Sequence, residues 1–216
     1  MLSVTFGVTF GNQHSYDDYG LILTEYDIGT PEARRYLAEV PGRNGILDMT
    51  GSLTPRITYG NRQLQFAFTW KSSPETYEAE LQKIINDIHG QQLHVVLDTD
   101  QDHYFDAFLT VDSSTFSGKQ KATVVITGDA YPYRFENTET VKTLTGSGTL
   151  VCENDRMEVI PEITVTAETT IVFGTISATL AAGTHKVADI ELAEGDNELE
   201  ITGSGTTTIR YRQGRL

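Results

Sequence analysis

The sequence predicts a mainly β protein, a β-rich α+β fold with one clear α-helix. Residues that favour strands (Thr, Val, Ile, Tyr and Phe) are frequent in the 216-residue chain, and 19 glycines supply turns. Apolar and polar residues alternate in many short segments, which is the pattern of half-buried strands. One segment alone carries apolar residues at the three- and four-residue spacing of a helix.

We expect two domains. Residues 1–135 should form an N-terminal β-sandwich or barrel-like domain that includes the helix, at about residues 74–89. Residues 136–216 should form a small β-sandwich, which is feasible at this length without disulfides. The polar and charged residues 134–142 are expected to form a short linker between them.

The first domain should begin with a strand. Leu2, Val4 and Phe6 alternate with polar residues, and Gly7 and Gly11 interrupt the pattern as a bend would. The other expected strands of this domain cover residues 19–26, 56–59, 63–70, 93–97, 104–111 and 122–127. The pair at 56–59 and 63–70 should form a hairpin through Gly60 and Asn61.

The helix has recognisable ends. Ser73 is a good N-cap residue, Pro74 suits the first turn, and Gly90 is suited to end the helix. Its apolar face should pack on a sheet and consists of Tyr77, Leu81, Ile84, Ile85 and Ile88. Trp70, the single tryptophan, lies in an apolar strand just before the helix and is expected in the core rather than on a sugar-binding platform.

The second domain shows no helical pattern. Apolar residues alternate with threonine, glutamate or arginine over residues 163–167, 198–201 and 208–211. Turn-forming residues separate these segments, as in all-β sandwiches.

The charge balance of 16 basic against 30 acidic residues, a net charge of -14, argues against binding to nucleic acid or to an anionic membrane. It fits a surface selected for solubility, or one that must let DNA pass without binding it. Cys152 is the single cysteine, so an internal disulfide is excluded, and we expect it to be buried. The sequence has no apparent signal peptide or membrane helix, so we expect a soluble product of the cytoplasm.

No catalytic, cofactor or metal site is predicted, and we expect no enzyme activity. The segment from Asp98 to Asp102 resembles the start of a calcium loop, but His103 and Leu109 stand where Gly and Glu belong, so a charged hairpin is the better interpretation. The five histidines lack the spacing of a zinc site, and Cys152 has no histidine nearby in sequence.

One segment carries a recognisable motif, Val40-Pro41-Gly42-Arg43-Asn44-Gly45-Ile46-Leu47-Asp48. Pro-Gly and Asn-Gly are strong turn dipeptides, so the segment should form a shaped loop with Arg43 at its middle. With the downstream Thr58-Tyr59-Gly60-Asn61-Arg62, it resembles the signature of the siphophage distal tail proteins. The order of helix, acidic turn, aromatic strand at 104–108 and C-terminal Tyr211-Arg212-Gln213-Gly214-Arg215-Leu216 is also similar to that family.

The resemblance implies a structural virion component, located in the phage tail and assembled in the host cytoplasm. In that family the N-terminal domain forms a six-membered ring between the tail tube and the tail tip or baseplate. Rings can stack, and the galectin-like or jelly-roll-like C-terminal domain holds other components. The implied partners are further copies of the chain, the tail tube protein, a tip or tail-associated lysin protein, and a receptor-binding protein, with no stable binding of nucleic acid or membrane.

The family-motif loop is Pro41, Gly42, Arg43, Asn44 and Gly45. The candidate residues of the ring interface or lumen are Val4, Phe6, Val8, Arg43 and Arg62. Arg43 could instead form an ion pair within its own chain, and both interpretations stay open. The alternative functions are a monomeric carbohydrate-binding or adhesin-like β module, and a hydrolase whose carboxylates come from distant segments.

Overall fold

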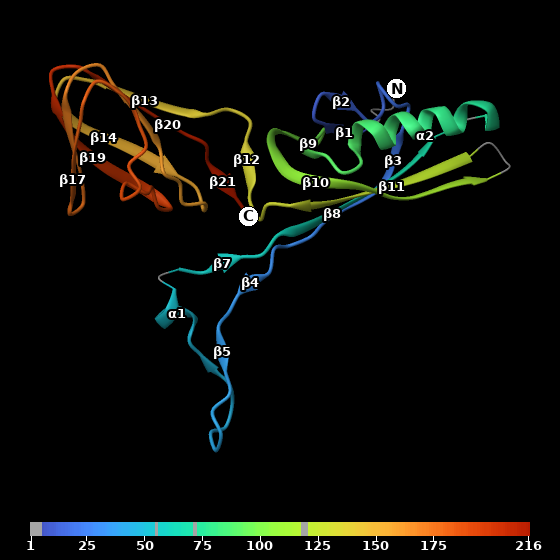
Figure 1. Ribbon diagram of the computed structural model, residues 1–216, viewed down its shortest axis with the longest axis horizontal. Helices are drawn as coiled ribbons and strands as arrows, with labels where there is room; N and C mark the ends of the chain where they lie inside the picture. The colour runs from blue at the N-terminus through green and yellow to red at the C-terminus, as the bar shows by residue number, and fades with distance from the viewer. Residues whose placement is uncertain (1–5, 55, 71–72, 118–120) are drawn as a thin grey trace. The chain divides into compact units, whose positions relative to one another are not determined.

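The computed structural model describes residues 6–54, 56–70, 73–117 and 121–216 (Figure 1). The chain divides into two compact units, unit 1 (residues 1–132) and unit 2 (residues 133–216). Strands dominate both, and the two helices of the described residues lie in unit 1, so the predicted mainly β fold class is confirmed. Neither helix is long and apolar enough to cross a lipid bilayer.

Unit 1 is built on one antiparallel sheet with the strand order β2-β1-β9-β10-β11-β8-β3. The strands expected at 19–26, 63–70, 93–97, 104–111 and 122–127 are present, and all but the first are longer than the sequence pattern indicates. The strand expected from Leu2 to Phe6 falls almost entirely outside the described residues. In chain order the strands of this sheet are β1 (Val8–Phe10), β2 (Gln13–His14), β3 (Ile22–Ile28), β8 (Arg62–Trp70), β9 (Gln92–Leu97), β10 (Asp100–Ser117) and β11 (Lys121–Ala130).

The sheet of unit 1 curls over its own core. Three strands separate β1 from β8, so a flat sheet would hold them roughly 19 Å apart. Phe10 of β1 nevertheless meets Phe66 and Phe68 of β8, with ring centroids 5.7 Å and 6.1 Å apart. A β-bulge in β10 between Val111 and Ser113 accompanies this bending, as bulges do in strongly curved sheets.

The predicted helix is present as α2 (Pro74–Ile88), and Gly90 follows it with a φ of 76°. Its buried face carries Ile84 and Ile88. Tyr77 stacks on Trp70 at 5.6 Å, and the Trp70 indole N–H donates to the Glu80 carboxylate, so Trp70 is a core residue as expected.

One local expectation for unit 1 was confirmed in position only, and a second was wrong. Ser73 occupies the N-cap position, but its hydroxyl makes no capping hydrogen bond to the helix backbone and contacts the Thr76 hydroxyl instead. The segments on either side of Gly60 and Asn61 do not pair with each other. Thr58–Tyr59 pairs instead with Ala33–Arg34 in the segment that follows β3, whereas β8 pairs with β3 itself and with β11.

Unit 2 contains two four-stranded antiparallel sheets, as a β-sandwich requires. One has the order β13-β20-β15-β18 and the other β14-β19-β16-β17. The strands of the first are β13 (Thr140–Thr145), β20 (Thr206–Tyr211), β15 (Glu162–Val165) and β18 (Gly183–His185). Those of the second are β14 (Gly148–Asn154), β19 (Gly195–Gly203), β16 (Thr169–Phe173) and β17 (Ile176–Leu180).

Both sheets turn their alternating apolar side chains inward. Ile163, Leu199 and Ile209 are fully buried in the shared core, as their alternation predicts, and Cys152 is buried there as expected. The sandwich therefore has the pattern expected for residues buried on one face of each sheet.

The expected linker at 134–142 was wrong, because most of it is strand. Within unit 2, β12 (Arg134–Glu136) pairs with β21 (Gly214–Arg215), and β13 begins at Thr140. The Arg212 guanidinium donates to the carbonyls of Glu136 and Asn137. Polar composition alone did not reveal that these residues pair with the end of the chain.

Candidate functional site

A long arm, residues 29–61, leaves the sheet of unit 1 between β3 and β8 (Figure 1). Its two sides run antiparallel and continue the pairing of β3 with β8. The Gly29 N–H donates to the Gln63 carbonyl and the Gly60 N–H to the Glu32 carbonyl, both at 2.8 Å. Beyond them β4 (Ala33–Arg34) pairs with β7 (Thr58–Tyr59), and β5 (Leu37–Ala38) with β6 (Leu47–Asp48). The short helix α1 (Thr50–Leu53), which the sequence pattern did not predict, lies between β6 and β7.

Local polar contacts hold the arm, since none of its residues belongs to the described core of unit 1. Asp48 is the centre of these contacts. It accepts from the Thr50 hydroxyl at 2.6 Å, from the Thr50 N–H at 3.0 Å and from the Arg35 guanidinium at 2.6 Å. The Thr50 hydroxyl oxygen in turn accepts the Tyr36 N–H at 2.9 Å. These hydrogen bonds, first that of the Thr50 hydroxyl and then that of Arg35, lower the pKa of Asp48 to about 2.

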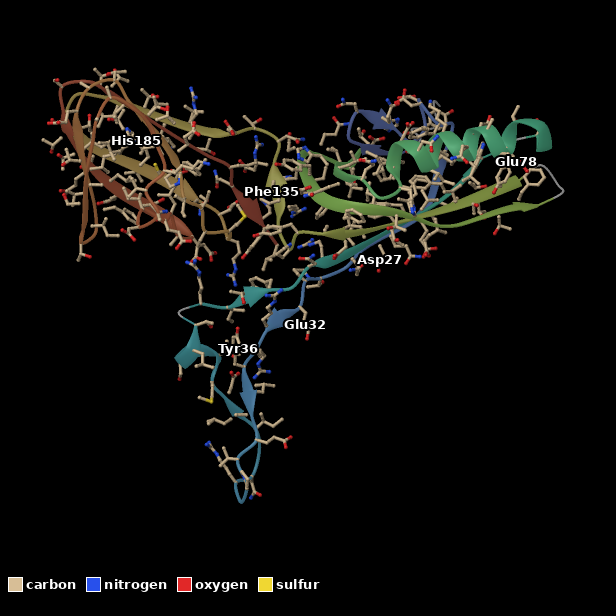
Figure 2. All side chains as sticks on the ribbon, viewed as in Figure 1. Asp27, Glu32, Tyr36, Glu78, Phe135 and His185 are labelled. Carbon is tan, nitrogen blue, oxygen red and sulfur yellow. The ribbon has the colours of Figure 1, made fainter. Side chains whose placement is uncertain are left out.

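The arm exposes many large apolar side chains. A hairpin this thin has no second layer to cover them, so they remain available to a partner. Tyr36 is among them and is labelled in Figure 2. The exposed set consists of Tyr36, Leu37, Val40, Ile46, Leu53 and Ile57. A hollow of about 350 Å³ also lies on the arm, between Arg35, Asp48 and Ile57.

The family-motif loop forms the tip of the arm, between β5 and β6. Gly42 and Gly45 have φ values of 81° and 80°, a left-handed conformation that other residues rarely adopt, so the two predicted turns are both present. The Arg43 N–H donates to the Val40 carbonyl at 3.1 Å. The Arg43 side chain is exposed and has no ion-pair partner among the described residues, so the geometry provides no intrachain salt bridge for it there.

The other candidate residues do not gather around Arg43. Val4 lies outside the described residues. Phe6 is 53% exposed, whereas Val8, two positions later, is fully buried. Arg62 is also buried: its Nε donates to the Pro132 carbonyl at 2.8 Å, and its guanidinium lies 5.2 Å from the centroid of the Phe105 ring. Val8 and Arg62 are therefore core residues of unit 1 in this chain.

The sequence reasoning missed the arm itself, and with it the apolar residues at 36–37, 46, 53 and 57. The sequence did contain a signal for a hairpin here, because short apolar segments flank the motif on both sides at similar distances. A loop with two left-handed glycines between such segments favours a hairpin tip.

Acidic residues stand on the outer face of the sheet of unit 1. On β10 and β11, Asp106 and Asp129 stand opposite the buried side, beside the exposed Phe108. The strands of this sheet contain seven acidic residues (Glu25, Asp27, Asp100, Asp102, Asp106, Asp112 and Asp129) and two basic ones (Arg62 and Lys121), and Arg62 points into the core.

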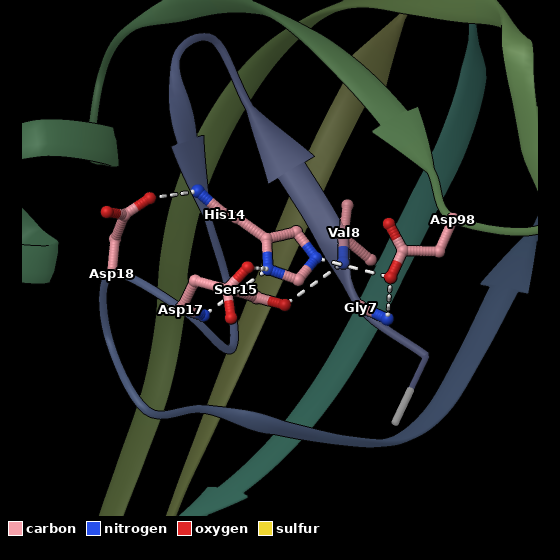
Figure 3. A network of polar contacts seen from close by, with 7 residues as sticks. All are labelled: Gly7, Val8, His14, Ser15, Asp17, Asp18 and Asp98. Carbon is pink, nitrogen blue, oxygen red and sulfur yellow. Dashed lines mark hydrogen bonds and ion pairs between the residues drawn. The ribbon is translucent and has the colours of Figure 1, made fainter. Parts of the chain in front are cut away.

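Two of the three carboxylates of the supposed calcium loop, those of Asp98 and Asp100, have other partners. The Asp98 carboxylate accepts the Gly7 N–H at 2.7 Å and lies 3.2 Å from His14 Nε2 (Figure 3). Asp100 lies 2.6 Å from His103 Nδ1. β9 and β10 pair across this turn, as expected for a charged hairpin. The described residues contain no group of three or more potential metal ligands.

The whole chain is similar in fold to the crystal structure of the Dit protein of phage SPP1, described as a paradigm of the hub adsorption apparatus in phages that infect Gram-positive bacteria. The match has a TM-score of 0.73 at 11% sequence identity and covers 98% of this chain and 99% of that chain. No family model and no curated protein sequence matches. At this identity the likeness establishes the fold.

Proposed function

We propose that this chain is a structural protein of a phage tail, the hub that joins the tail tube to the tip or baseplate. One observation carries the proposal: the similarity to the SPP1 hub protein extends over both units and nearly all of both chains. A shared single domain would be weak support, because common folds serve many functions. A match over two domains in the same order is more specific than a match over one domain, and the motif resemblance supports the same assignment.

In this proposal the chain assembles into a six-membered ring. A head-to-tail contact that closes into a ring needs two different surfaces on each copy. The arm supports such an arrangement, because the described residues of unit 1 leave its large apolar side chains exposed. An isolated hairpin of this kind is marginally stable in water, so a partner that covers it would stabilise it.

The acidic outer face of the sheet is the proposed lining of the ring channel. DNA crosses this channel when the phage ejects its genome. Carboxylates such as Asp106 and Asp129 repel phosphates, whereas Lys and Arg side chains would retain them. The scarcity of basic residues on these strands supports this role.

Unit 2 is the proposed platform for the other tip components. The proposed partners are the tail tube protein, a tip or tail-associated lysin protein and a receptor-binding protein, and rings can stack. In this proposal the protein belongs to the virion, and its role requires neither catalysis nor a cofactor.

The surface of the unit 2 sandwich is rich in hydroxyl groups. Cross-strand pairs such as Thr145–Thr206, whose hydroxyl oxygens lie 3.1 Å apart, contribute to the stability of the sheet.

The test is absolute mass by light scattering during size exclusion over a concentration series, with negative-stain images of the peak. A species of six or twelve times 23.9 kDa with ring-shaped particles is the expected result. A monomer at every concentration that also binds glycans on an array would contradict the proposal and favour a carbohydrate-binding module.

A further inference from the structure

Charge is divided unequally within unit 1. The arm carries four basic residues (Arg34, Arg35, Arg43 and Arg56) against three acidic ones (Glu32, Glu39 and Asp48), which gives a net charge of +1. The remainder of residues 1–132 carries 5 basic against 14 acidic residues, a net charge of -9. The arm is therefore electrostatically complementary to the rest of unit 1.

The tip of the arm combines one cation with apolar surface. Residues 40–46 contain no acidic residue, and Val40 and Ile46 are 43% and 58% exposed. Arg43 lies between them, exposed and without an ion-pair partner among the described residues. A surface that receives this tip should offer carboxylates next to exposed apolar side chains.

The edge strand β3 offers such a surface. It ends the sheet, so its outer backbone groups pair with no described strand. Ile22 and Tyr26 are 43% and 46% exposed on it. Glu25 and Asp27 line a hollow of about 310 Å³ together with Gln65 and Ala67.

Glu25 and Asp27 are two carboxylates without a described partner that share one hollow, which sets β3 apart from a single unpaired carboxylate such as Asp102 on β10. Neither has a hydrogen-bond or ion-pair partner among the described residues, whereas Asp98, Asp106 and Asp129 all accept hydrogen bonds within unit 1. Asp27 lies on the sheet close to the base of the arm (Figure 2). Two unneutralised carboxylates beside a hollow match a single extended guanidinium.

The tip cannot reach the β3 edge of its own chain. β3 runs directly into the arm, whose strands continue the ladder away from the sheet (Figure 1). The ten residues from Gly29 to Ala38 carry the tip up to roughly 33 Å from the end of β3. A contact between these two surfaces therefore joins two copies.

We infer that the arm tip of one copy docks on the β3 edge of the next copy. Arg43 enters the hollow and pairs with Asp27 and Glu25, while Val40 and Ile46 cover Tyr26 and Ile22. The two surfaces differ, so the contact is head-to-tail, the type of contact that forms a ring when the rotation between successive copies closes. The inference rests on the proposed self-assembly and identifies the surfaces that make it.

Charge reversal tests the pairing. Arg43→Glu and Asp27→Arg should each raise the concentration at half-assembly about tenfold or more in light scattering of the full chain. The combined variant should return to within about threefold of the parent. Asp102→Arg is the matched control, because it makes the same charge change at an exposed carboxylate on β10, and it should assemble like the parent.

Disulfide trapping provides a readout that works even when assembly is weak. A full chain with Arg43→Cys and Asp27→Cys should give a ladder of cross-linked species, up to six, under mild oxidation, whereas Arg43→Cys with Asp102→Cys should not. The native Cys152 is buried and does not interfere.

The outcomes separate this inference from the proposed function. Rings that form in the parent and persist in both single reversals, or a combined variant that stays as weak as the singles, would overturn the docking inference and leave the ring proposal standing. A parent that is monomeric and gives no cross-linked ladder would overturn both.

Discussion

The Thr50 hydroxyl donates a 2.6 Å hydrogen bond to the Asp48 carboxylate, and this pair organises the arm. Arg35 approaches the other Asp48 oxygen from β4's side of the hairpin, and Tyr36 is tied to Thr50 through its N–H. The contact sits where β6 meets α1, in a segment that has no hydrophobic core to hold it. Its polar chemistry can therefore be tested directly by titration.

Replacing Thr50 by Val should return the pKa of Asp48 from about 2 toward its ordinary value near 4. The pKa of the folded state is depressed, so the contribution of Asp48 to the order of the arm is complete above pH 4 and is lost as the pH falls toward 2. Carboxyl NMR titration checks this. Thr50→Ser keeps the hydroxyl and should keep the low pKa, and an unchanged pKa in Thr50→Val would contradict the assignment.

The second prediction concerns the free energy of unfolding and rests on the contact between Phe10 and Phe66. Phe10 is 1% exposed, and its ring connects β1 with β8, which three strands separate in the curled sheet. Phe10→Ala should cost about 3–5 kcal/mol, because it removes a buried ring and leaves a cavity. The measurement is chemical denaturation followed by fluorescence of Trp70, which is the single tryptophan and reports on unit 1.

A surface phenylalanine of the same unit is the control for Phe10. Phe108 is 52% exposed on the outer face of the sheet, so Phe108→Ala should change stability by less than about 0.5 kcal/mol. Equal losses for the two variants would mean that the sheet does not close over Phe10.

Sequence patterns predicted the parts of the fold in which burial is periodic. Helix α2 and the strands of unit 2 were predictable because Ile84 and Ile88, or Leu199 and Ile201, recur on one face and are fully or almost fully buried. These elements pack on a large core, so their hydrophobic period has to match their geometry.

The arm was not predictable in this way. Its strands are two residues long and bury almost nothing, so no hydrophobic period marks them. Val8 and Arg62 were misassigned for a different reason, because both lie on the buried face of a strand. Arg62 alternates with Leu64 and Phe66 on the buried face of β8, and its charge is accommodated by the Pro132 carbonyl and the Phe105 ring.

Burial raises the pKa of the Cys152 thiol to about 11. At pH 8 the thiol is then protonated, and the thiolate is the reactive form, so native Cys152 should react with a disulfide reagent at least about a hundredfold more slowly than in the unfolded chain. Stopped-flow absorbance measures both rates. A matched control places the thiol one residue away, in Val151→Cys with Cys152→Ala, where the side chain is 39% exposed and should react readily.

Gly7 lies against the His14 ring in a polar network that fixes the start of β1 (Figure 3). Its N–H donates to Asp98, whose carboxylate also contacts His14 Nε2, and the Val8 N–H donates to the buried Ser15 hydroxyl at 3.0 Å. A Cβ at position 7 would overlap the His14 ring and lie 2.9 Å from Ser15 Oγ. Nothing larger than glycine can occupy this position unless the ring moves.

Gly7→Ala should therefore cost about 1–3 kcal/mol of unfolding free energy, as overpacking of a filled site does. Gly51→Ala, on α1, places its new Cβ in open space and should change stability by less than about 0.5 kcal/mol. Combining Gly7→Ala with His14→Ala removes the ring that the new methyl group meets, so the double variant should lose less than the sum of the single losses. Strictly additive losses in denaturation followed by Trp70 fluorescence would show instead that the cost of Gly7→Ala arises at Ser15 or in the backbone, and that His14 is not the neighbour that requires glycine.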